Sequence, residues 1–181
     1  HYIKDRVREL SRQKKIPALI IPVLFDSISF GGVSENHEPY LLYTGSADYE
    51  DIWKIVIDTA DHLHRAGKNI RLILTCPGKK QSVNNLRNYI SDKKMNSSVK
   101  YLGYVDDIRF NELIGGASIL FAPLPDNLQS TARFSTKLAF FLASGVPVLT
   151  SNVGEVKYYL KDGENAFVVS EDCKINELSE K

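Results

Sequence analysis

Short apolar runs alternate along the chain with longer segments in which apolar residues recur every three or four positions. The runs predict strands at residues 18–23, 40–44, 70–75, 99–102, 118–122, 148–150 and 166–169. The periodic segments predict helices at 1–15, 48–66, 81–93, from 106, from 135 or 136 to Gly145, from 155 to 160 and from 174 to 181. Polar stretches at 26–39 and 123–133 predict loops.

This alternation of strands and helices predicts an α/β fold. Strands that are apolar on both faces form parallel sheets covered by helices on both sides, and right-handed crossovers then give a doubly wound, Rossmann-like sheet. Ligands bind such a sheet at the carboxyl ends of its strands, near the point where strand order reverses. The loops expected at that edge are 45–48, 76–79, 103–105, 123–136 and 151–155.

One stretch, residues 133–152, carries most of the candidate chemistry. Ser135 or Thr136 can cap its helix by accepting a hydrogen bond from a free backbone N–H, and Gly145 suits the left-handed residue that ends it. Arg133 and Lys137 lie four positions apart beside the positive end of this helix, which favours an anion. The pattern indicates a diphosphate site, although each cation can equally be a solvated charge at a helix start.

Composition narrows the function classes. The chain has 181 residues and is 43% hydrophobic, which fits one domain with a proper core. Its 23 basic and 22 acidic residues give a net charge of +1, so the charge does not favour a nucleic-acid-binding protein. We find no membrane-spanning run and no signal peptide. Cys76 and Cys173 have no metal-ligand spacing, which predicts free thiols, no metal site and a cytoplasmic location.

The other reactive residue types give no catalytic set. His62 and His64 lie on the helix predicted at 48–66 and are expected at the surface. Cys76 is expected to be a buried thiol and not a nucleophile. No acid–base pair or triad is visible, so the catalytic residues are unknown.

The stretch 133–152 resembles the donor-binding domain of GT-B glycosyltransferases, in particular the large retaining family four (glycosyl transferases group 1). The matching positions are Ser135/Thr136, Lys137, Leu138, Leu142, Ala143, Gly145, Pro147 and Val148. Segments 41–45, 99–105 and 161–169 are similar to further motifs of the family, in the same order along the chain. The resemblance extends over nearly all of residues 18–181.

The resemblance implies that the chain is one half of a GT-B architecture, the C-terminal domain that binds a nucleotide sugar. Residues 1–26 would be the tail of a missing N-terminal domain and the crossing segment, and 27–39 a linker loop. Residues 40–181 would be the donor-binding domain, with its C-terminal helix cut short. We therefore expect a fragment of a two-domain enzyme that catalyses no transfer alone.

The implied activity is hexosyl transfer, with retention, from a nucleotide-diphosphate sugar to a cell-surface polysaccharide or glycolipid. No cofactor and no metal ion are expected. The implied partners are the donor, a glycan or glycolipid acceptor and the N-terminal domain, and the full-length protein could associate peripherally with a membrane. The identities of the nucleotide, sugar and acceptor stay open.

Position within the resemblance adds further binding residues. Gly45 and Ser46 would meet the diphosphate or sugar, Tyr104 and Val105 the nucleobase, and Glu155 the sugar or ribose hydroxyls. Each has a plain structural alternative: an ordinary strand-to-helix turn, a half-buried loop tyrosine, and an acidic residue favoured at a helix start. The complete candidate set is Gly45, Ser46, Tyr104, Val105, Arg133, Ser135, Thr136, Lys137 and Glu155.

Two departures from the family pattern keep another function open. The family has two glutamates, of which the second usually binds ribose, and their positions are Ala132 and Phe140 here. The arginine and lysine that often follow the first glycine are also replaced, by residues 46–49. A catalytically degenerate binding or regulatory module is therefore the alternative. A sugar-nucleotide epimerase is a weaker one, because its acid–base residues cannot be placed.

Overall fold

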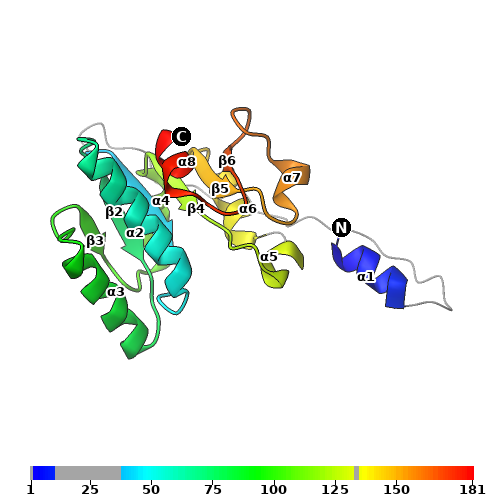
Figure 1. Cartoon of the computed structure of the whole chain (residues 1–181), viewed down its shortest axis with the longest axis horizontal. Coiled ribbons are helices and arrows are strands. Elements are labelled where there is room, and N and C mark those ends of the chain that lie inside the picture. Colours follow the sequence, from blue (N-terminus) through cyan, green and yellow to red (C-terminus); the bar gives the residue numbers. More distant parts are fainter. Residues whose placement is uncertain (1, 11–37, 133–134) are drawn as a thin grey trace.

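The computed structural model describes residues 2–10, 38–132 and 135–181. The strand expected at 18–23, the end of the helix expected at 1–15, most of the loop at 26–39, and Arg133 lie outside the described residues. Within them, six parallel strands form one sheet in the order β3-β2-β1-β4-β5-β6 (Figure 1). The doubly wound, Rossmann-like sheet predicted from the sequence is confirmed.

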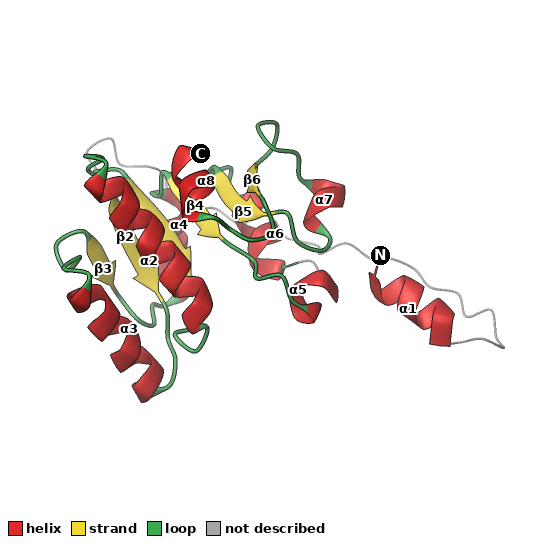
Figure 2. Ribbon diagram, in the orientation of Figure 1, coloured by secondary structure: helices red, strands yellow, loops and turns green. Residues whose placement is uncertain are grey.

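The element bounds follow the hydrophobic pattern closely. The strands are β1 (Tyr40–Thr44), β2 (Arg71–Thr75), β3 (Val99–Tyr101), β4 (Ile119–Ala122), β5 (Val148–Ser151) and β6 (Phe167–Val169). The helices are α1 (Tyr2–Leu10), α2 (Glu50–Arg65), α3 (Lys80–Asp92), α4 (Asp107–Gly115), α5 (Leu128–Ala132), α6 (Thr136–Ala143), α7 (Val156–Tyr159) and α8 (Ile175–Glu180) (Figure 2).

The first strand lies inside the sheet, between β2 and β4, and all five of its residues are buried. Chain order reverses here: β2 and β3 extend to one side of β1, whereas β4, β5 and β6 extend to the other. Parallel sheets leave a crevice at such a switch point, on the carboxyl side of the strands. The topology therefore places any ligand site near the ends of β1 and β4.

Helices cover both faces of the sheet. One apolar layer joins the sheet to α2, α3 and α8, and includes Trp53, Ile57, Leu86 and Leu178. A second layer joins it to α4, α6 and α7, and includes Leu113, Leu138, Phe141 and Val156. Leu138 and Phe141 are fully buried, so α6 packs through the apolar stripe that the sequence predicted.

Two local predictions were wrong. The expected loop 123–133 contains the short helix α5, which has no buried residue and hence no apolar stripe to reveal it. The side chain of Ser135, at the N-cap of α6, makes no capping hydrogen bond. Asp106, where the sequence predicts a helix to begin, is the N-cap of α4, and its carboxylate accepts a 2.8 Å hydrogen bond from the Arg109 N–H. Gly145 also has the expected left-handed backbone, with φ of +74°.

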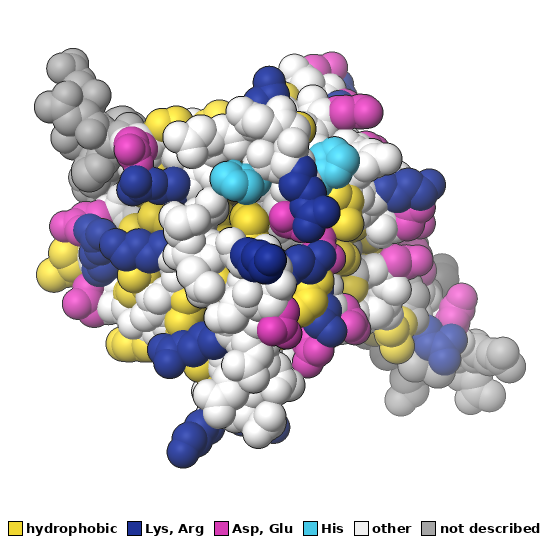
Figure 3. All heavy atoms as spheres, turned by 60° about the vertical axis from the view of Figure 1, so that its left-hand side comes forward, with side chains coloured by type: hydrophobic (Ala, Val, Ile, Leu, Met, Phe, Trp, Pro, Cys, Tyr) yellow, Lys and Arg dark blue, Asp and Glu magenta, His cyan; other side chains and the backbone are white. Residues whose placement is uncertain are grey.

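The surface gives no second indication of function. Basic and acidic side chains are interspersed over the face shown in Figure 3, as the near-zero net charge suggests. His62 and His64 are exposed as predicted, while Cys76 and Cys173 are buried and free. Across 2–10, 38–132 and 135–181, no helix could cross a bilayer, and no group of three or more His, Cys, Asp or Glu side chains could hold a metal ion.

Candidate functional site

A small cavity of about 270 Å³ opens at the carboxyl edge of the sheet, beside the switch point. It takes its walls from the ends of β1, β2 and β3, from α4 and from α6. The lining residues are Thr44, Gly45, Thr75, Pro77, Gly103, Tyr104, Val105, Phe110 and Lys137. Four of the nine predicted binding residues, Gly45, Tyr104, Val105 and Lys137, therefore lie together.

Among the described residues that line this cavity, Lys137 is the only cation. It sits in the first turn of α6, and its ammonium donates a hydrogen bond to the carbonyl oxygen of Thr44, at the end of β1. The same nitrogen lies over the ring of Tyr43, 5.3 Å from the ring centroid. A residue that follows β4 thus places its charge at the end of β1, across the point where strand order reverses.

The charge of Lys137 is poorly compensated. Among the residues that the structure describes, no carboxylate forms an ion pair with its ammonium, and burial lowers its pKa below the usual 10.5. A buried cation without an anionic partner is costly, and functional sites are where such groups occur most often. An anionic ligand entering the cavity would supply the missing negative charge.

The loops after β1 and β2 are fixed to each other by backbone hydrogen bonds. The Gly45 N–H donates to the Thr75 carbonyl at 3.1 Å, and the Ala47 N–H donates to the Pro77 carbonyl at 3.0 Å. These two donors are consequently engaged within the protein and are not free for a phosphate. Gly45 contributes to the cavity through its lack of a side chain, since a Cβ there would lie 2.5 Å from the Tyr43 hydroxyl.

The outer wall of the cavity is aromatic. Tyr104 is 79% exposed. The alternative that the sequence left open, a half-buried loop tyrosine, is therefore wrong. Phe110, in the first half of α4, stacks on Phe140 of α6, with ring centroids 5.8 Å apart and an angle of 24° between the planes. The phenylalanine at the family's glutamate position is thus part of an apolar wall behind the cavity.

The remaining candidates lie apart from this cavity or outside the described residues. Ser46 accepts a 3.1 Å hydrogen bond from the Asp48 N–H, within its own loop. Glu155 is only 7% exposed and takes the N-cap position of α7. Ser135 and Thr136 begin α6 without lining the cavity. Arg133 lies outside the described residues, so its predicted role stays a prediction, as do the roles of these four.

The sequence reasoning missed Tyr43 and Phe110. Tyr43 is a buried strand residue, and nothing in its pattern indicates that its ring meets a lysine 94 positions later. Phe110 lies one helical turn after the Asp106 cap, and only its nearness in sequence to Tyr104 could have suggested the cavity. Contacts between distant segments of this kind do not leave a periodic signal.

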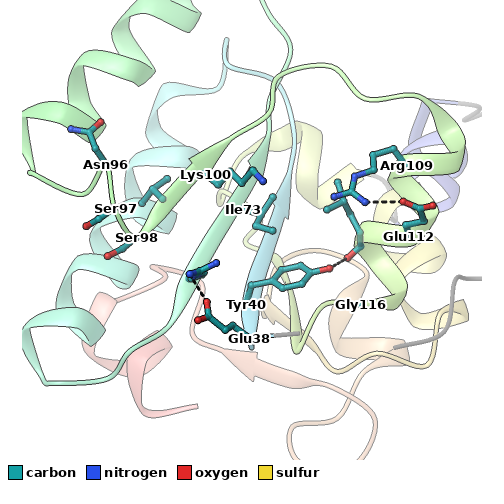
Figure 4. A pocket seen from close by; sticks show the side chains of 13 residues that line it. Glu38, Tyr40, Ile73, Asn96, Ser97, Ser98, Lys100, Arg109, Glu112 and Gly116 are labelled. Carbon is teal, nitrogen blue, oxygen red and sulfur yellow. Dashed lines mark hydrogen bonds and ion pairs between the residues drawn. The ribbon is translucent and has the colours of Figure 1, made fainter. Parts of the chain in front are cut away.

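A larger cavity, of about 1020 Å³, lies at the opposite edge of the sheet. It is a groove at the amino ends of β1, β2 and β3, and its charged side chains largely pair with one another (Figure 4). Arg109 forms a 2.8 Å ion pair with Glu112, and Arg71 pairs with Glu38. The Tyr40 hydroxyl donates a 2.8 Å hydrogen bond to the Leu113 carbonyl. This groove is therefore larger than the carboxyl-edge cavity, but its charged side chains are better paired.

Solved structures share this fold. The chain aligns with the pneumococcal O-GlcNAc transferase GtfA, in complex with UDP and GlcNAc, at a TM-score of 0.71 and 18% identity, over 99% of this chain and 35% of that one. Sucrose-phosphate synthase from Thermosynechococcus elongatus aligns at 0.66 and 18%, over 79% of this chain and 35% of that one. The C-terminal domain of a glycosyl transferase group 1 protein (LpcC) from Francisella tularensis aligns at 0.65 and 12%, over 82% and 81%.

The extent of these matches matters. The chain spans about a third of the length of the first and second of these enzymes, but most of the isolated C-terminal domain. At such identities the likeness shows the fold alone, which is the Rossmann-like half of a GT-B architecture. A comparison with curated proteins gives no match.

A family model provides the closer assignment. The model described as Glycosyl transferases group 1 matches residues 38–181, which include all six strands and every residue of the carboxyl-edge cavity. The match covers well over half of the chain and agrees with the resemblance found in the sequence. The chain therefore belongs to the glycosyl transferases group 1 family.

Proposed function

We propose that this chain binds the diphosphate of a nucleotide sugar at the carboxyl-edge cavity, as the donor domain of a two-domain glycosyltransferase. The acceptor is a cell-surface polysaccharide or glycolipid, held mainly by the N-terminal domain. The observation that carries the proposal is the partly buried ammonium of Lys137, which lacks a carboxylate partner among the described residues at the switch point of the sheet. Membership of the family supports it, as do the UDP and sugar named with two solved structures of the same fold.

The chemistry of transfer gives this cation a role. The bond between the anomeric carbon and a diphosphate oxygen breaks, and negative charge develops on the departing diphosphate. A fixed cation that is already desolvated stabilises that charge more effectively than one in water, and it needs little reorganisation during the reaction. Lys137 would hold the leaving group, with Tyr104 and Val105 close enough along the same wall to meet the nucleobase.

The proposed location is the cytoplasm, where two free, buried thiols are compatible with a reducing environment. The full-length protein would reach a lipid-linked acceptor by peripheral association with a membrane. The donor domain alone would bind nucleotide but transfer no sugar, because the acceptor side of the cleft belongs to the other domain.

Calorimetric titration with UDP, GDP and ADP tests donor binding. We expect one nucleotide to bind, and Lys137→Ala to weaken its affinity about 10- to 100-fold, which is the usual contribution of a hydrogen bond to a charged group. Lys68→Ala is the matched control, because Lys68 is exposed at the end of α2 and away from the cavity. Equal affinity of Lys137→Ala and the unaltered protein for the bound nucleotide would contradict the proposal.

Phe140 favours a second candidate, a binding or regulatory module that has lost transfer. Its ring stacks on Phe110 and cannot accept the ribose hydrogen bonds that the family's glutamate usually accepts. Donor turnover by the two-domain protein decides between the candidates. Release of nucleotide diphosphate from a sugar donor supports the enzyme, whereas donor binding without turnover over many hours supports the regulatory module.

A further inference from the structure

The position of the Lys137 ammonium is set by two partners on β1. One is the Thr44 carbonyl oxygen, which accepts its hydrogen bond, and the other is the ring of Tyr43 beneath it. Both partners are rigid. Tyr43 is 2% exposed within the core, and the strand that carries both residues is hydrogen-bonded on each side, to β2 and β4.

We propose that Tyr43 is a positioning residue of the site, whose ring face keeps the Lys137 ammonium charged and holds it where a nucleoside diphosphate enters. The identity of the ligand rests on the function proposed above, whereas the effect of Tyr43 on Lys137 does not. The negative face of an aromatic ring attracts a cation within about 6 Å, and this attraction is greatest where the cation has lost its water.

The aromatic ring of Tyr43, and not its hydroxyl, is the group that stabilises the Lys137 ammonium. Burial raises the pKa of the Tyr43 hydroxyl, so that this group stays neutral and supplies no negative charge. The hydroxyl points toward Gly45, where a Cβ would come within 2.5 Å of it. Because glycine has no side chain, the Tyr43 ring can extend to the end of β1, where the Lys137 ammonium lies over it.

Within the described part of the chain, no other titratable group near the ammonium stabilises its charge in the same way. Cys76, at the end of β2, interacts electrostatically with Lys137, but burial raises the pKa of its thiol to about 12, which leaves it neutral at physiological pH. Tyr104 shares the cavity and is mostly in water. Phe110, from α4, carries no charge. Among the described residues, the Tyr43 ring and the Thr44 carbonyl are thus the two groups that offset the burial of this cation.

The first test measures the pKa of Lys137 in the ligand-free protein, by NMR titration of lysine side-chain resonances assigned with Lys137→Met. Tyr43→Phe keeps the ring, and we expect it to leave this pKa unchanged. Tyr43→Leu removes the ring, and we expect the pKa to fall by about one pH unit. Equal pKa values in all three proteins, or equal falls in both variants, would overturn the proposal.

Fluorination removes the ring's negative potential without changing its shape, and so covers the case in which Tyr43→Leu does not fold. Relative to Tyr43→Phe, which keeps the full ring potential, 4-fluorophenylalanine and then 3,4,5-trifluorophenylalanine at position 43 should lower the Lys137 pKa progressively. Tyr89→Leu controls for loss of an aromatic residue that packs against the same core layer, because Tyr89 contacts Lys54 and Lys93 instead of Lys137. It should leave the Lys137 pKa unchanged, and a flat fluorination series would contradict the role of the ring.

A parallel titration with UDP, GDP and ADP separates this inference from the proposed function. If a nucleotide binds, Tyr43→Leu should weaken it about fivefold at neutral pH and more as pH rises, while Tyr43→Phe restores the affinity. If none binds but the pKa falls as expected, the positioning role holds and the donor function fails. If a nucleotide binds and the pKa does not move, the donor function holds and the positioning role fails.

Discussion

The two edges of the sheet differ in how their charges are compensated. The groove at the amino edge holds about 1020 Å³ and is lined by arginines that pair with glutamates. The cavity at the carboxyl edge holds about 270 Å³ and contains one partly buried ammonium, whose contacts among the described residues are a carbonyl oxygen and a ring face. The charged side chains of the larger groove are thus better paired than the ammonium of the smaller cavity.

We therefore base the proposed site on charge compensation and not on cavity volume. A groove whose arginines pair with glutamates has little to gain from a charged ligand, and exposed pairs of this kind contribute little energy either way. A desolvated cation without a counter-charge is costly in the empty protein, and an anion relieves that cost when it binds. The smaller cavity therefore has the greater capacity to bind a diphosphate.

The largest effect we expect comes from steric crowding at the carboxyl edge. Gly154, in the loop after β5, has φ of +61°, and a Cβ there would lie 2.5 Å from the Ser130 carbonyl oxygen and 2.8 Å from the Thr131 Cα of α5. Gly154→Ala should lower the free energy of unfolding by about 3 kcal/mol, because overpacking adds to an unfavourable backbone conformation. Urea denaturation measures the loss.

Gly67, before the amino end of β2, is the matched control for Gly154. Its φ of +77° is equally unfavourable for alanine, but no atom lies within 4 Å of a Cβ built there. Gly67→Ala should therefore cost only about 1 kcal/mol, the backbone part alone. Equal losses in the two variants would show that α5 does not pack against the β5 loop as tightly as described.

A smaller effect of opposite sign is expected from Lys137→Met. Burial lowers the pKa of Lys137, so between that pKa and 10.5 the unfolded chain binds more protons than the folded protein, and stability rises with pH. Below both values the full burial cost remains. Lys137→Met removes it and should raise the free energy of unfolding by about 1 kcal/mol at pH 7, a gain often seen at functional positions.

The pH dependence of this gain provides its own check. The difference between Lys137→Met and the unaltered protein should shrink as pH rises through the lowered pKa of Lys137 and vanish above 10.5. Lys100→Met, at the exposed amino-edge groove, should change stability little at any pH. Loss of stability in Lys137→Met at neutral pH would mean that the ammonium is better compensated than its surroundings indicate.

The smallest expected effect concerns metal ions. We propose that the Lys137 ammonium carries the diphosphate charge without a divalent cation, so the affinity for the nucleotide should be the same in EDTA and in millimolar Mg²⁺. Calorimetry in the two buffers makes the comparison. An affinity that falls more than about threefold in EDTA would show that a metal ion helps to compensate the diphosphate charge at the carboxyl edge.

Most of the fold followed from local patterns, and the missing parts have physical causes. Strand β1 has the predicted bounds because five consecutive buried residues leave a continuous apolar run. Helix α5 was missed because it buries none of its residues. The Ser135 cap was wrong because residue type indicates that a cap can form, whereas the hydrogen bond depends on side-chain rotation and surroundings.

The candidate site was predictable in outline but not in its contacts. The switch-point argument identified the strand ends, and the helix start identified Lys137. Gly45 was expected to meet the diphosphate or sugar, but the residue type could not reveal that its N–H donates to the Thr75 carbonyl on the neighbouring strand. The pairing of Lys137 with Tyr43 was invisible, because residues so far apart in sequence meet only after the sheet has assembled.

The most direct test of the central claim is a map of backbone amide chemical-shift changes on adding UDP, GDP or ADP to the isotopically labelled protein. We predict that the bound nucleotide shifts the amides of residues 44–46, 103–105 and 136–138, at the carboxyl edge. Amides at 96–100 and of Glu112, Leu113 and Gly116, which line the larger groove, should not move. Shifts confined to that groove would contradict the account.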